Sequence, residues 1–316
     1  MLQLKVDRIE AATPRVRRIV LSSASGDNLP AFAAGAHIDI ELPNEETRSY
    51  SLLNDCPEAD RYIVGVLREP DGFGGSVYLH DRLAVGDILK ASAPSNDFPL
   101  YEAGEANILI AGGIGITPIM SMAGRLAELG RDYTLHYCAR SEEEAAFLDE
   151  LRARHRDRLK THFDGGDPAR GLDLKALLGT RPPGAHVYVC GPIGLIRDTI
   201  AATADWPQGT VHYELFTGSA ADLTAEHHDQ PFDIVLKKAG KTYTVPADKS
   251  ILAVLKAEGF KIKTLCTSGR CGTCRVGYLS GKVEHRDEVL DDDERQTFLQ
   301  VCVSRAMPGE TLVLDL

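Results

Sequence analysis

The sequence predicts a multidomain chain of three parts: an antiparallel β-barrel over residues 1–100, a doubly wound parallel α/β domain over 101–222, and an α+β domain over 232–316 after a linker at 223–231. Three observations carry this prediction. Short strands separated by turn residues fill the first part, strands then alternate with helices, and four cysteines gather near the C-terminus. The first pattern is typical of a small barrel and the second of a parallel sheet.

The barrel is predicted from strand patterns before residue 100. Residues 37–42 alternate between apolar and polar side chains, so one face of that strand is expected to be buried. Further strands are expected at 16–21, 62–67 and 88–91, with turn residues such as Pro70-Asp71-Gly72 between them.

The α/β domain is predicted from the change of pattern near residue 105. Thr117 is expected to cap a helix that has Pro118 at its first position and ends at Gly130. The other expected elements are strands at 108–111, 133–139, 159–163, 186–190 and 211–216, and helices over about 142–154 and 193–204.

The last domain opens with strands at 232–237 and 242–245, joined by a hairpin at Ala239-Gly240. A short helix over 250–258 ends at Gly259. Asp291 and Glu294 form a capping-box pattern, which predicts a helix over 292–300. The alternative interpretation of the acidic run from Asp287 to Glu294 is that it steers a charged partner.

Four cysteines have the ligand spacing of a plant-type [2Fe–2S] cluster. Cys266, Cys271 and Cys274 follow a C-x4-C-x2-C pattern, and Cys302 comes later in the chain. Glycines in the loop allow the backbone to wrap a cluster and leave amides free to point at sulfur. The alternatives are a four-cysteine zinc site and cysteines that merely pack in a core. Zinc sites usually pair two short C-x2-C units, and this segment has one.

Charge and cysteine usage exclude several classes of protein. The net charge of −11 argues against a nucleic-acid binder. Cys56, Cys138 and Cys190 remain outside the cluster pattern, and this odd remainder indicates reduced thiols and a cytoplasmic protein. The N-terminus lacks the apolar region of a signal peptide. The uncharged run 106–124 has Gly112, Gly113, Gly115 and Pro118 in its middle, so we expect a strand, a turn and a helix there and no membrane span.

Two segments of the barrel carry groups that suit a flavin. In Arg48-Ser49-Tyr50-Ser51, which follows a predicted strand, the tyrosine ring suits stacking, the second serine suits a hydrogen bond to N5, and the arginine suits phosphate. The amides and hydroxyl of Gly74-Gly75-Ser76 suit a phosphate. The alternatives are a strand with a surface arginine and an ordinary tight loop.

Two segments of the α/β domain suit a dinucleotide. The run from Gly112 to Pro118 joins a strand to a helix, where amides and the helix N-terminus favour a pyrophosphate. Cys190-Gly191-Pro192 ends a later strand, and ligands of open α/β sheets bind beyond the carboxyl ends of strands. Cys190 is therefore expected beside a nicotinamide. The alternatives are a plain strand–helix turn and a buried cysteine that only fills space.

The choice of coenzyme depends on the charges at the end of the second parallel strand. Arg140-Ser141 stands where the adenosine ribose is expected, and the arginine would favour the 2′-phosphate of NADPH. Glu142, Glu143 and Glu144 follow at once and oppose that charge. The sequence therefore favours NADH. The alternative interpretation is a solvated helix start, where acids favour the helix dipole.

Taken together, these motifs resemble the phthalate dioxygenase reductase family within the ferredoxin–NADP reductase superfamily. The resemblance covers the whole chain, and residues 284–306 also resemble the family's ferredoxin tail. It implies an FMN-binding barrel, an NAD-binding domain and a C-terminal β-grasp ferredoxin. It also implies electron transfer from NADH through FMN and [2Fe–2S] to a Rieske-type oxygenase, in an aromatic ring dioxygenase or O-demethylase system.

The resemblance also implies which residues form the sites. Ser51, Thr117 and Cys190 are the candidate catalytic residues. FMN would be contacted by Arg48, Ser49, Tyr50, Ser51, Gly65, Val66, Leu67, Gly74, Gly75, Ser76, Thr117 and Phe216, and NAD by Gly113, Gly115, Thr117, Pro118, Arg140, Ser141, Cys190, Gly191 and Pro192. The chain departs from many relatives at Phe73, where they carry arginine. Phosphate charge must then come from Arg48, helped by Arg68.

Two other functions stay open. The reductase of a di-iron hydroxylase usually has its ferredoxin domain first and uses FAD, and here the cysteines come last. A redox-sensing iron–sulfur flavoprotein would use the cluster as a switch and would not sustain turnover with an electron acceptor. We expect an oxygenase component as partner, no binding to nucleic acid or membrane, and a monomer.

Overall fold

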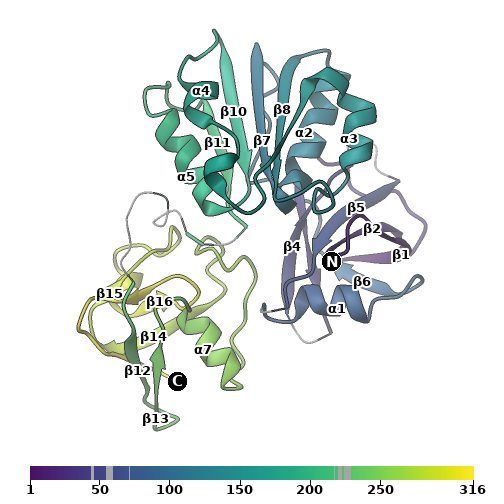
Figure 1. The fold of residues 1–316 in the computed structure, drawn as a ribbon. Helices are drawn as coiled ribbons and strands as arrows, with labels where there is room; N and C mark the ends of the chain where they lie inside the picture. The colour runs from purple at the N-terminus through teal and green to yellow at the C-terminus, as the bar shows by residue number, and fades with distance from the viewer. Residues whose placement is uncertain (44–45, 55–59, 71, 217, 220–222, 224–228) are drawn as a thin grey trace. The chain divides into compact units, whose positions relative to one another are not determined.

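The computed structural model describes residues 1–43, 46–54, 60–70, 72–216, 218–219, 223 and 229–316 (Figure 1). The chain divides into two compact units, Met1–Glu214 and Leu215–Leu316. The first unit contains the predicted barrel and the predicted α/β domain, and the second contains the four cysteines. Cys56 and most of the predicted linker lie outside the described residues.

The N-terminal part of the first unit is a six-stranded antiparallel sheet in the order β4-β3-β6-β1-β2-β5. A bridge between Leu52 and Val64 joins the two edge strands, and the Leu53 amide donates to the Ile63 carbonyl at 3.0 Å. The sheet therefore closes, which confirms the predicted antiparallel barrel. Its strands are β1 (Leu2–Ala11), β2 (Val16–Ser23), β3 (His37–Glu41), β4 (Thr47–Ser51), β5 (Arg61–Leu67) and β6 (Ile88–Ala91).

The inward side chains of the barrel form one apolar core. Alternate residues of β3 and β5 are buried there, among them Ile38, Ile40 and Val64. Two segments differ from the prediction. Arg48-Ser49-Tyr50-Ser51 lies within β4 and does not follow a strand, and Gly75-Ser76 begins the helix α1 (Gly75–Asp81).

The C-terminal part of the first unit is a five-stranded parallel sheet in the order β11-β10-β7-β8-β9. In Figure 1, α2 and α3 lie on one side of this sheet and α4 and α5 on the other, so the predicted doubly wound fold is confirmed. The strands are β7 (Ala106–Gly112), β8 (Asp132–Ala139), β9 (Leu159–Phe163), β10 (Ala185–Cys190) and β11 (Val211–Glu214); the helices are α2 (Ile116–Glu128), α3 (Leu148–His155), α4 (Leu174–Leu178) and α5 (Ile193–Ala202).

Three boundaries of the α/β domain differ from the prediction. The N-cap of α2 is Gly115, and Thr117 is the second helical residue, whose hydroxyl donates to the Ile114 carbonyl at 3.1 Å. Helix α3 begins at Leu148 instead of near 142, because Phe147 has a left-handed backbone with φ of 62°. Strand β11 ends at Glu214 and does not reach Phe216.

The predicted strand, turn and helix over the uncharged run 106–124 are confirmed by β7 and α2. Among the residues that the structure describes, no helix is long and apolar enough to cross a membrane.

The second unit has a mixed sheet in the order β13-β12-β18-β14-β16, in which β12 and β18 are parallel and the other pairs antiparallel. The predicted hairpin β12–β13 turns at Gly240, whose φ is 64°. The elements are β12 (Phe232–Leu236), β13 (Lys241–Val245), α7 (Ile251–Ala257), β14 (Arg275–Ser280), β15 (Val283–Glu284), β16 (Phe298–Gln300), β17 (Arg305–Ala306) and β18 (Leu312–Leu314). This hairpin, helix and central parallel pair are the predicted β-grasp.

The capping box of the second unit is confirmed, but the helix predicted after it is wrong. The Asp291 carboxylate accepts hydrogen bonds from the amides of Asp293 and Glu294, and Glu294 reaches back to the Asp291 amide. Only a 3-10 turn over Glu294–Gln296 follows. The next residues, Phe298–Gln300, form β16, because their backbone pairs with β14.

Candidate functional site

The parallel sheet reverses its strand order between β7 and β10, and the two predicted nucleotide-binding segments meet there. Ala111, near the end of β7, is the register partner of Cys190, at the end of β10. A Cβ atom added to Gly115 would lie 2.2 Å from the Cys190 carbonyl oxygen, and one added to Gly191 would lie 2.8 Å from the Gly112 Cα atom. The two segments therefore pack backbone against backbone, at the point where open α/β sheets bind ligands.

The glycines of this crevice have different roles. Gly115 and Gly191 allow close packing, since any side chain there would collide with backbone. Gly113 has φ of 53°, and a Cβ atom added to it would meet none of the described atoms within 4 Å. Open space thus faces Gly113 directly before α2, where free amides and the helix dipole favour a pyrophosphate. The residues present fit a dinucleotide.

Cys190 lies at this crevice with a carboxylate that the sequence analysis missed. Cys190 is fully buried, and its register partner on β11 is Glu214, which is 6% exposed. Register partners on neighbouring parallel strands point to the same face of a sheet, so both side chains stand at the carboxyl edge. The sequence did contain a signal for Glu214, because an acidic residue at the carboxyl end of a buried parallel strand is well placed to face a ligand.

The barrel meets the α/β domain at Thr117. A Cβ atom added to Gly65 of β5 would lie 2.7 Å from the Thr117 Cγ2 atom, and Thr117 itself is buried. The structure therefore brings together one residue predicted to contact FMN and one predicted to lie between flavin and nicotinamide. Val66 points into the barrel core and Leu67 is half-buried, so only the backbone of Val66 is available to a cofactor.

The predicted phosphate-binding residues of the barrel converge on the start of α1. Arg48 lies close to Gly75, since a Cβ atom there would be 3.1 Å from the Arg48 Cγ atom, and its guanidinium stacks on Phe73 at 5.6 Å. The same guanidinium forms an ion pair with Glu46 at 2.8 Å. One cation beside the free amides of a helix start fits the phosphate of FMN.

Arg68, the second cation predicted to help bind the phosphate, is paired with another residue. Arg68 forms an ion pair with Asp81 at 2.8 Å, which raises the pKa of Arg68 and lowers that of Asp81. The Ser76 hydroxyl accepts the Glu69 amide at 3.0 Å and so holds the loop before α1. Arg48 is therefore the cation placed best for a phosphate at this position.

Among the other predicted flavin contacts on β4, Tyr50 and Ser51 are placed as a flavin site requires, and Ser49 is not. Tyr50 packs against the barrel core, and burial raises the pKa of its phenol, so the ring stays neutral. Ser51 is buried next to it, whereas the Ser49 hydroxyl is exposed and donates to Asp39 at 2.6 Å. Gly74 has a left-handed backbone immediately before α1. Phe216 belongs to the second unit, and its place beside the flavin stays a prediction.

At the predicted ribose position the arginine is exposed, whereas two of the three acids form hydrogen bonds with other side chains. Arg140 is exposed directly after β8. Glu142 accepts a hydrogen bond from Arg152 at 2.5 Å, and a hydrogen bond from Ser141 lowers the pKa of Glu143. The negative charge that opposes a 2′-phosphate is thus partly held by other partners.

The four cysteines of the second unit form two pairs. The Cys271 thiol, followed by Ser268, lowers the pKa of Cys266 to about 4, and the Cys302 thiol lowers the pKa of Cys274. Cys266 thus interacts with Cys271, and Cys274 with Cys302. The amides of Ser268 and Cys271 also point at the Cys266 sulfur, at 3.5 and 3.3 Å. Cys266 is therefore placed to be a thiolate.

Two thiol pairs fit a two-iron cluster. In a [2Fe–2S] cluster with four cysteines, each iron takes two thiolates. Among the residues that the structure describes, no group of three or more His, Cys, Asp or Glu side chains is gathered around one metal position. Gly269 and Gly272 have φ of 77° and 74°, the left-handed backbone that lets the loop turn around the cluster.

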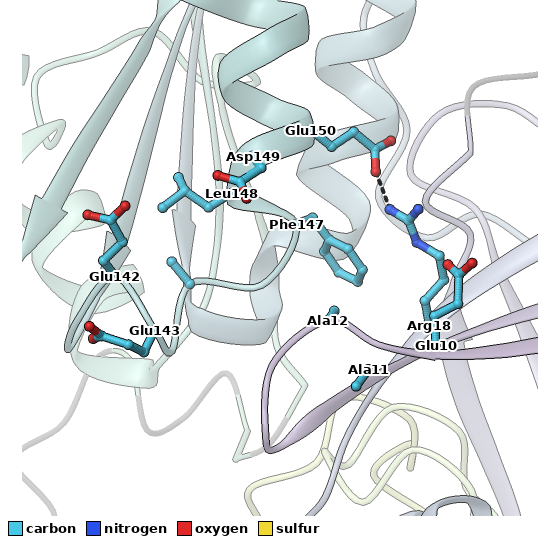
Figure 2. A pocket seen from close by; sticks show the side chains of 11 residues that line it. Glu10, Ala11, Ala12, Arg18, Glu142, Glu143, Phe147, Leu148, Asp149 and Glu150 are labelled. Carbon is cyan, nitrogen blue, oxygen red and sulfur yellow. Dashed lines mark hydrogen bonds and ion pairs between the residues drawn. The ribbon is translucent and has the colours of Figure 1, made fainter.

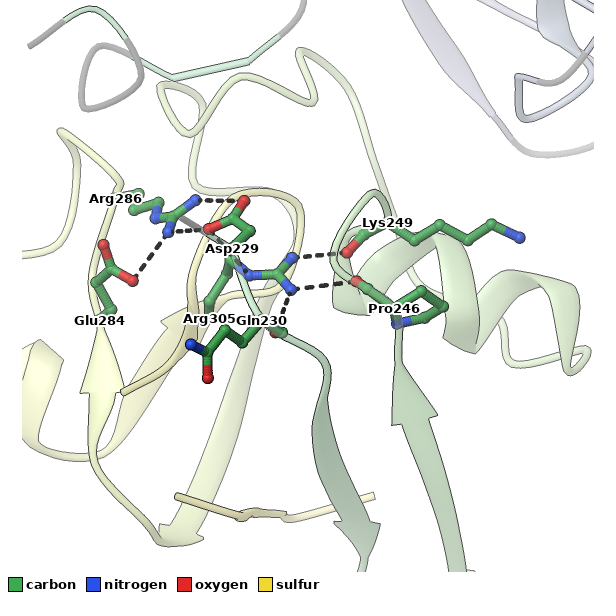
Figure 3. A network of polar contacts seen from close by, with 7 residues as sticks. All are labelled: Asp229, Gln230, Pro246, Lys249, Glu284, Arg286 and Arg305. Carbon is green, nitrogen blue, oxygen red and sulfur yellow. Dashed lines mark hydrogen bonds and ion pairs between the residues drawn. The ribbon is translucent and has the colours of Figure 1, made fainter. Parts of the chain in front are cut away.

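A network of two buried arginines and two partly exposed carboxylates ties the end of the predicted linker to the second unit (Figure 3). Arg286 pairs with Asp229 at 2.6 Å and with Glu284 at 2.9 Å, and Arg305 lies 3.5 Å from Asp229. Arg305 also donates to the carbonyls of Lys249, Gln230 and Pro246. Asp229 and Gln230 therefore belong to the folded unit, a feature that composition alone did not indicate.

Comparison with known proteins identifies the domain families of the chain. Residues 109–200 match the oxidoreductase NAD-binding domain family, and residues 234–307, which contain all four cysteines, match the 2Fe-2S iron-sulfur cluster binding domain family. The chain is 43% identical to the reductase subunit of tert-butanol monooxygenase / tert-amyl alcohol desaturase from Aquincola tertiaricarbonis, covering 100% of this chain and 96% of that one.

Phthalate dioxygenase reductase from Burkholderia cepacia is 41% identical, with 100% of this chain and 97% of that one covered. A solved structure of a phthalate dioxygenase reductase has a TM-score of 0.76 at 40% identity, covering 100% of this chain and 98% of the other. The similarity therefore extends over the barrel, the nucleotide-binding sheet and the cysteine-containing unit.

Proposed function

This chain belongs to the phthalate dioxygenase reductase family, and on that premise we propose that it passes electrons from NADH, through FMN and its own [2Fe–2S] cluster, to an oxygenase component. One observation carries the proposal. A dinucleotide crevice at the strand-order reversal, a flavin-type barrel joined to it at Thr117, and two cysteine pairs all occur in a single chain.

The chain's own residues would bind and orient the groups. When bound, FMN accepts a hydride from NADH and passes single electrons to the cluster. Arg48 and the first amides of α1 hold the flavin phosphate, and the neutral ring of Tyr50 offers a stacking face. The amides near Gly113 hold the pyrophosphate of NADH.

The reacting ends are oriented by buried groups. Thr117, in the first turn of α2, lies against Gly65 of β5. Cys190, at the end of β10, is a small buried side chain that leaves room for the nicotinamide. Ser51 is buried beside Tyr50 and is the hydroxyl that we assign to flavin N5. These buried positions limit the water that reaches the site of hydride transfer.

We assign the electron acceptor to the oxygenase class because the similar proteins are reductases or reductase subunits of a dioxygenase and a monooxygenase. Within that class we propose a Rieske-type oxygenase, which takes one electron at a time as the cluster delivers it. The final organic substrate belongs to that component. We also propose a cytoplasmic monomer.

The first test is analytical and kinetic. Purified holoprotein should contain one FMN and two irons per chain, and it should reduce ferricyanide continuously with NADH. Zinc in place of iron would contradict the cluster, and FAD in place of FMN would contradict the flavin. A protein that binds both groups but does not sustain turnover would be a redox sensor instead of a reductase.

A further inference from the structure

We propose that Phe147 is a positioning residue: its ring holds the flavin strand β5 at a fixed separation from the start of α2. The inference rests on the proposed function, since this separation sets how the nicotinamide meets the flavin. Phe147 is not among the residues predicted to contact either cofactor, and no motif in the sequence marked it.

The backbone of Phe147 is in a conformation that aromatic residues rarely adopt. Its φ of 62° and ψ of 14° are left-handed, a region that favours glycine and asparagine. Such strain persists only where the surroundings hold it, and it occurs often at functional sites. In this chain the left-handed residue ends the loop 140–146 and starts α3, and it aims the ring away from that helix toward the barrel (Figure 2).

The ring lies against a glycine of the flavin strand. A Cβ atom added to Gly65 would be 3.2 Å from the Phe147 Cζ atom and 2.7 Å from the Thr117 Cγ2 atom. Phe147 is only 7% exposed. Phe147 and Thr117 thus occupy the space above one residue of β5, and their two side chains determine how close the strand comes to α2.

A second residue of the barrel, Arg18, contacts the face of the Phe147 ring. Arg18 of β2 is the register partner of Gly65, and its guanidinium lies 4.9 Å from the centre of the Phe147 ring. The same guanidinium forms an ion pair with Glu150 in the first turn of α3 (Figure 2). We call Phe147, Arg18 and Glu150 the Phe147 wedge. It connects β2 and β5 of the barrel to α3 of the α/β domain.

The wedge lies beside the reacting groups and not among them. Gly65 is a predicted FMN contact and Thr117 a predicted contact of both flavin and nicotinamide, whereas the Phe147 ring lies against Gly65 and is itself not a predicted cofactor contact. Removing the ring should therefore change the spacing of donor and acceptor and leave both binding sites intact. A shift of about 1 Å in a reacting pair can slow a reaction up to about a hundredfold.

The test compares three substitutions of one residue. Phe147→Ala removes the ring and keeps the strain, Phe147→Asn removes the ring and relieves the strain, and Phe147→Tyr keeps the ring. We expect flavin reduction by NADH, followed by stopped flow, to be about tenfold slower in the first two variants and near normal in the third. The FMN dissociation constant should stay within about twofold of wild type in all three.

A structural readout does not depend on hydride transfer. In the purified holoprotein, hydrogen exchange of the β5 amides should be faster in Phe147→Ala and Phe147→Asn than in wild type or Phe147→Tyr. Phe147→Asn should melt at or above the temperature of Phe147→Ala, since asparagine tolerates the left-handed backbone. A more stable protein that still transfers hydride slowly would separate positioning from mere stability. Asp149→Asn changes a fully exposed side chain next to Glu150, so it is the matched control and should behave as wild type.

Several outcomes are decisive. Wild-type rates and wild-type β5 exchange in Phe147→Ala and Phe147→Asn would overturn the proposal. If Phe147→Ala does not fold, Arg18→Gln and Glu150→Gln provide a milder test, because each removes one charge that supports the ring. Both should slow flavin reduction by about two- to fivefold. Unchanged rates in both variants would also overturn the proposal. If NADH fails to reduce the wild-type flavin, the proposed function is wrong, and the exchange experiment still decides whether the wedge fixes β5.

Discussion

Arg270 donates a hydrogen bond to the main-chain carbonyl of Leu215, with 3.2 Å between Nη2 and the oxygen. Arg270 lies in the cluster loop between Cys266 and Cys271, and Leu215 directly follows Glu214, the last residue of β11. The loop that holds three of the four cluster cysteines is therefore bonded to the first residue of its own unit.

This bond predicts a role for Arg270 in electron transfer to the cluster. Arg270→Ala should leave flavin reduction by NADH unchanged and slow cluster reduction about threefold to tenfold, because a hydrogen bond of about 1 kcal/mol no longer restrains the loop. Stopped-flow absorbance resolves the two phases. Arg275→Ala is the matched control, since Arg275 follows the loop and pairs with Glu294. Equal effects of the two variants would show that the Leu215 bond has no special role.

Removal of one cluster ligand should separate the two halves of the proposed reaction. Cys274→Ser breaks the Cys274–Cys302 pair and should abolish iron binding, while NADH-driven reduction of ferricyanide continues, because the flavin can pass electrons to a small oxidant directly. Cys138→Ser is the control. Burial raises the pKa of the Cys138 thiol to about 12, so it is inert and lies outside the cluster loop. Loss of ferricyanide reduction in Cys274→Ser would contradict the order of carriers.

Arg48 should dominate the binding of the flavin phosphate. Phe73 stacks on its guanidinium and supplies no charge, and Arg68 is paired with Asp81. Arg48→Ala should therefore weaken FMN binding by about 1.5–3 kcal/mol, or roughly ten- to a hundredfold in dissociation constant. Phe73→Arg should recover part of this loss, and Arg68→Ala should have little effect. An unchanged flavin content in Arg48→Ala would place the phosphate elsewhere.

NADH should reduce the flavin faster than NADPH at equal concentration. The acids after Arg140 repel a 2′-phosphate, although Glu142 and Glu143 are partly engaged by Arg152 and Ser141. Each close, partly exposed charge pair is worth on the order of 1 kcal/mol, so the double variant Glu142→Gln, Glu143→Gln should raise the rate with NADPH about fivefold. Equal rates with both nucleotides in the wild-type protein would mean that Arg140 reaches the phosphate unopposed.

Local patterns predicted most of the fold because the relevant signals lie within a few residues of each other. Strand alternation identified β3, and the cysteine spacing identified the cluster loop. The capping box at Asp291 was also local and correct. The helix predicted after it failed because pairing of Phe298–Gln300 with β14 is a tertiary contact that no capping pattern contains.

The site residues that the sequence did not reveal depend on distant contacts. Phe147 appeared to be part of an ordinary helix, yet its left-handed backbone is held by Arg18 and Gly65, which come from two barrel strands. Glu214 became notable only when β10 and β11 were paired in register. The glycine run was assigned to phosphate as a whole, whereas Gly115 serves packing and Gly113 alone faces open space.

Anaerobic titration of the holoprotein with NADH tests the central claim most directly. The account predicts uptake of about three electrons per chain, two by the flavin and one by the cluster, with the electron paramagnetic resonance signal of a reduced [2Fe–2S] centre in wild type and none in Cys274→Ser. Uptake of two electrons by the flavin alone, with an intact cluster that stays oxidised, would contradict electron transfer from NADH to the cluster.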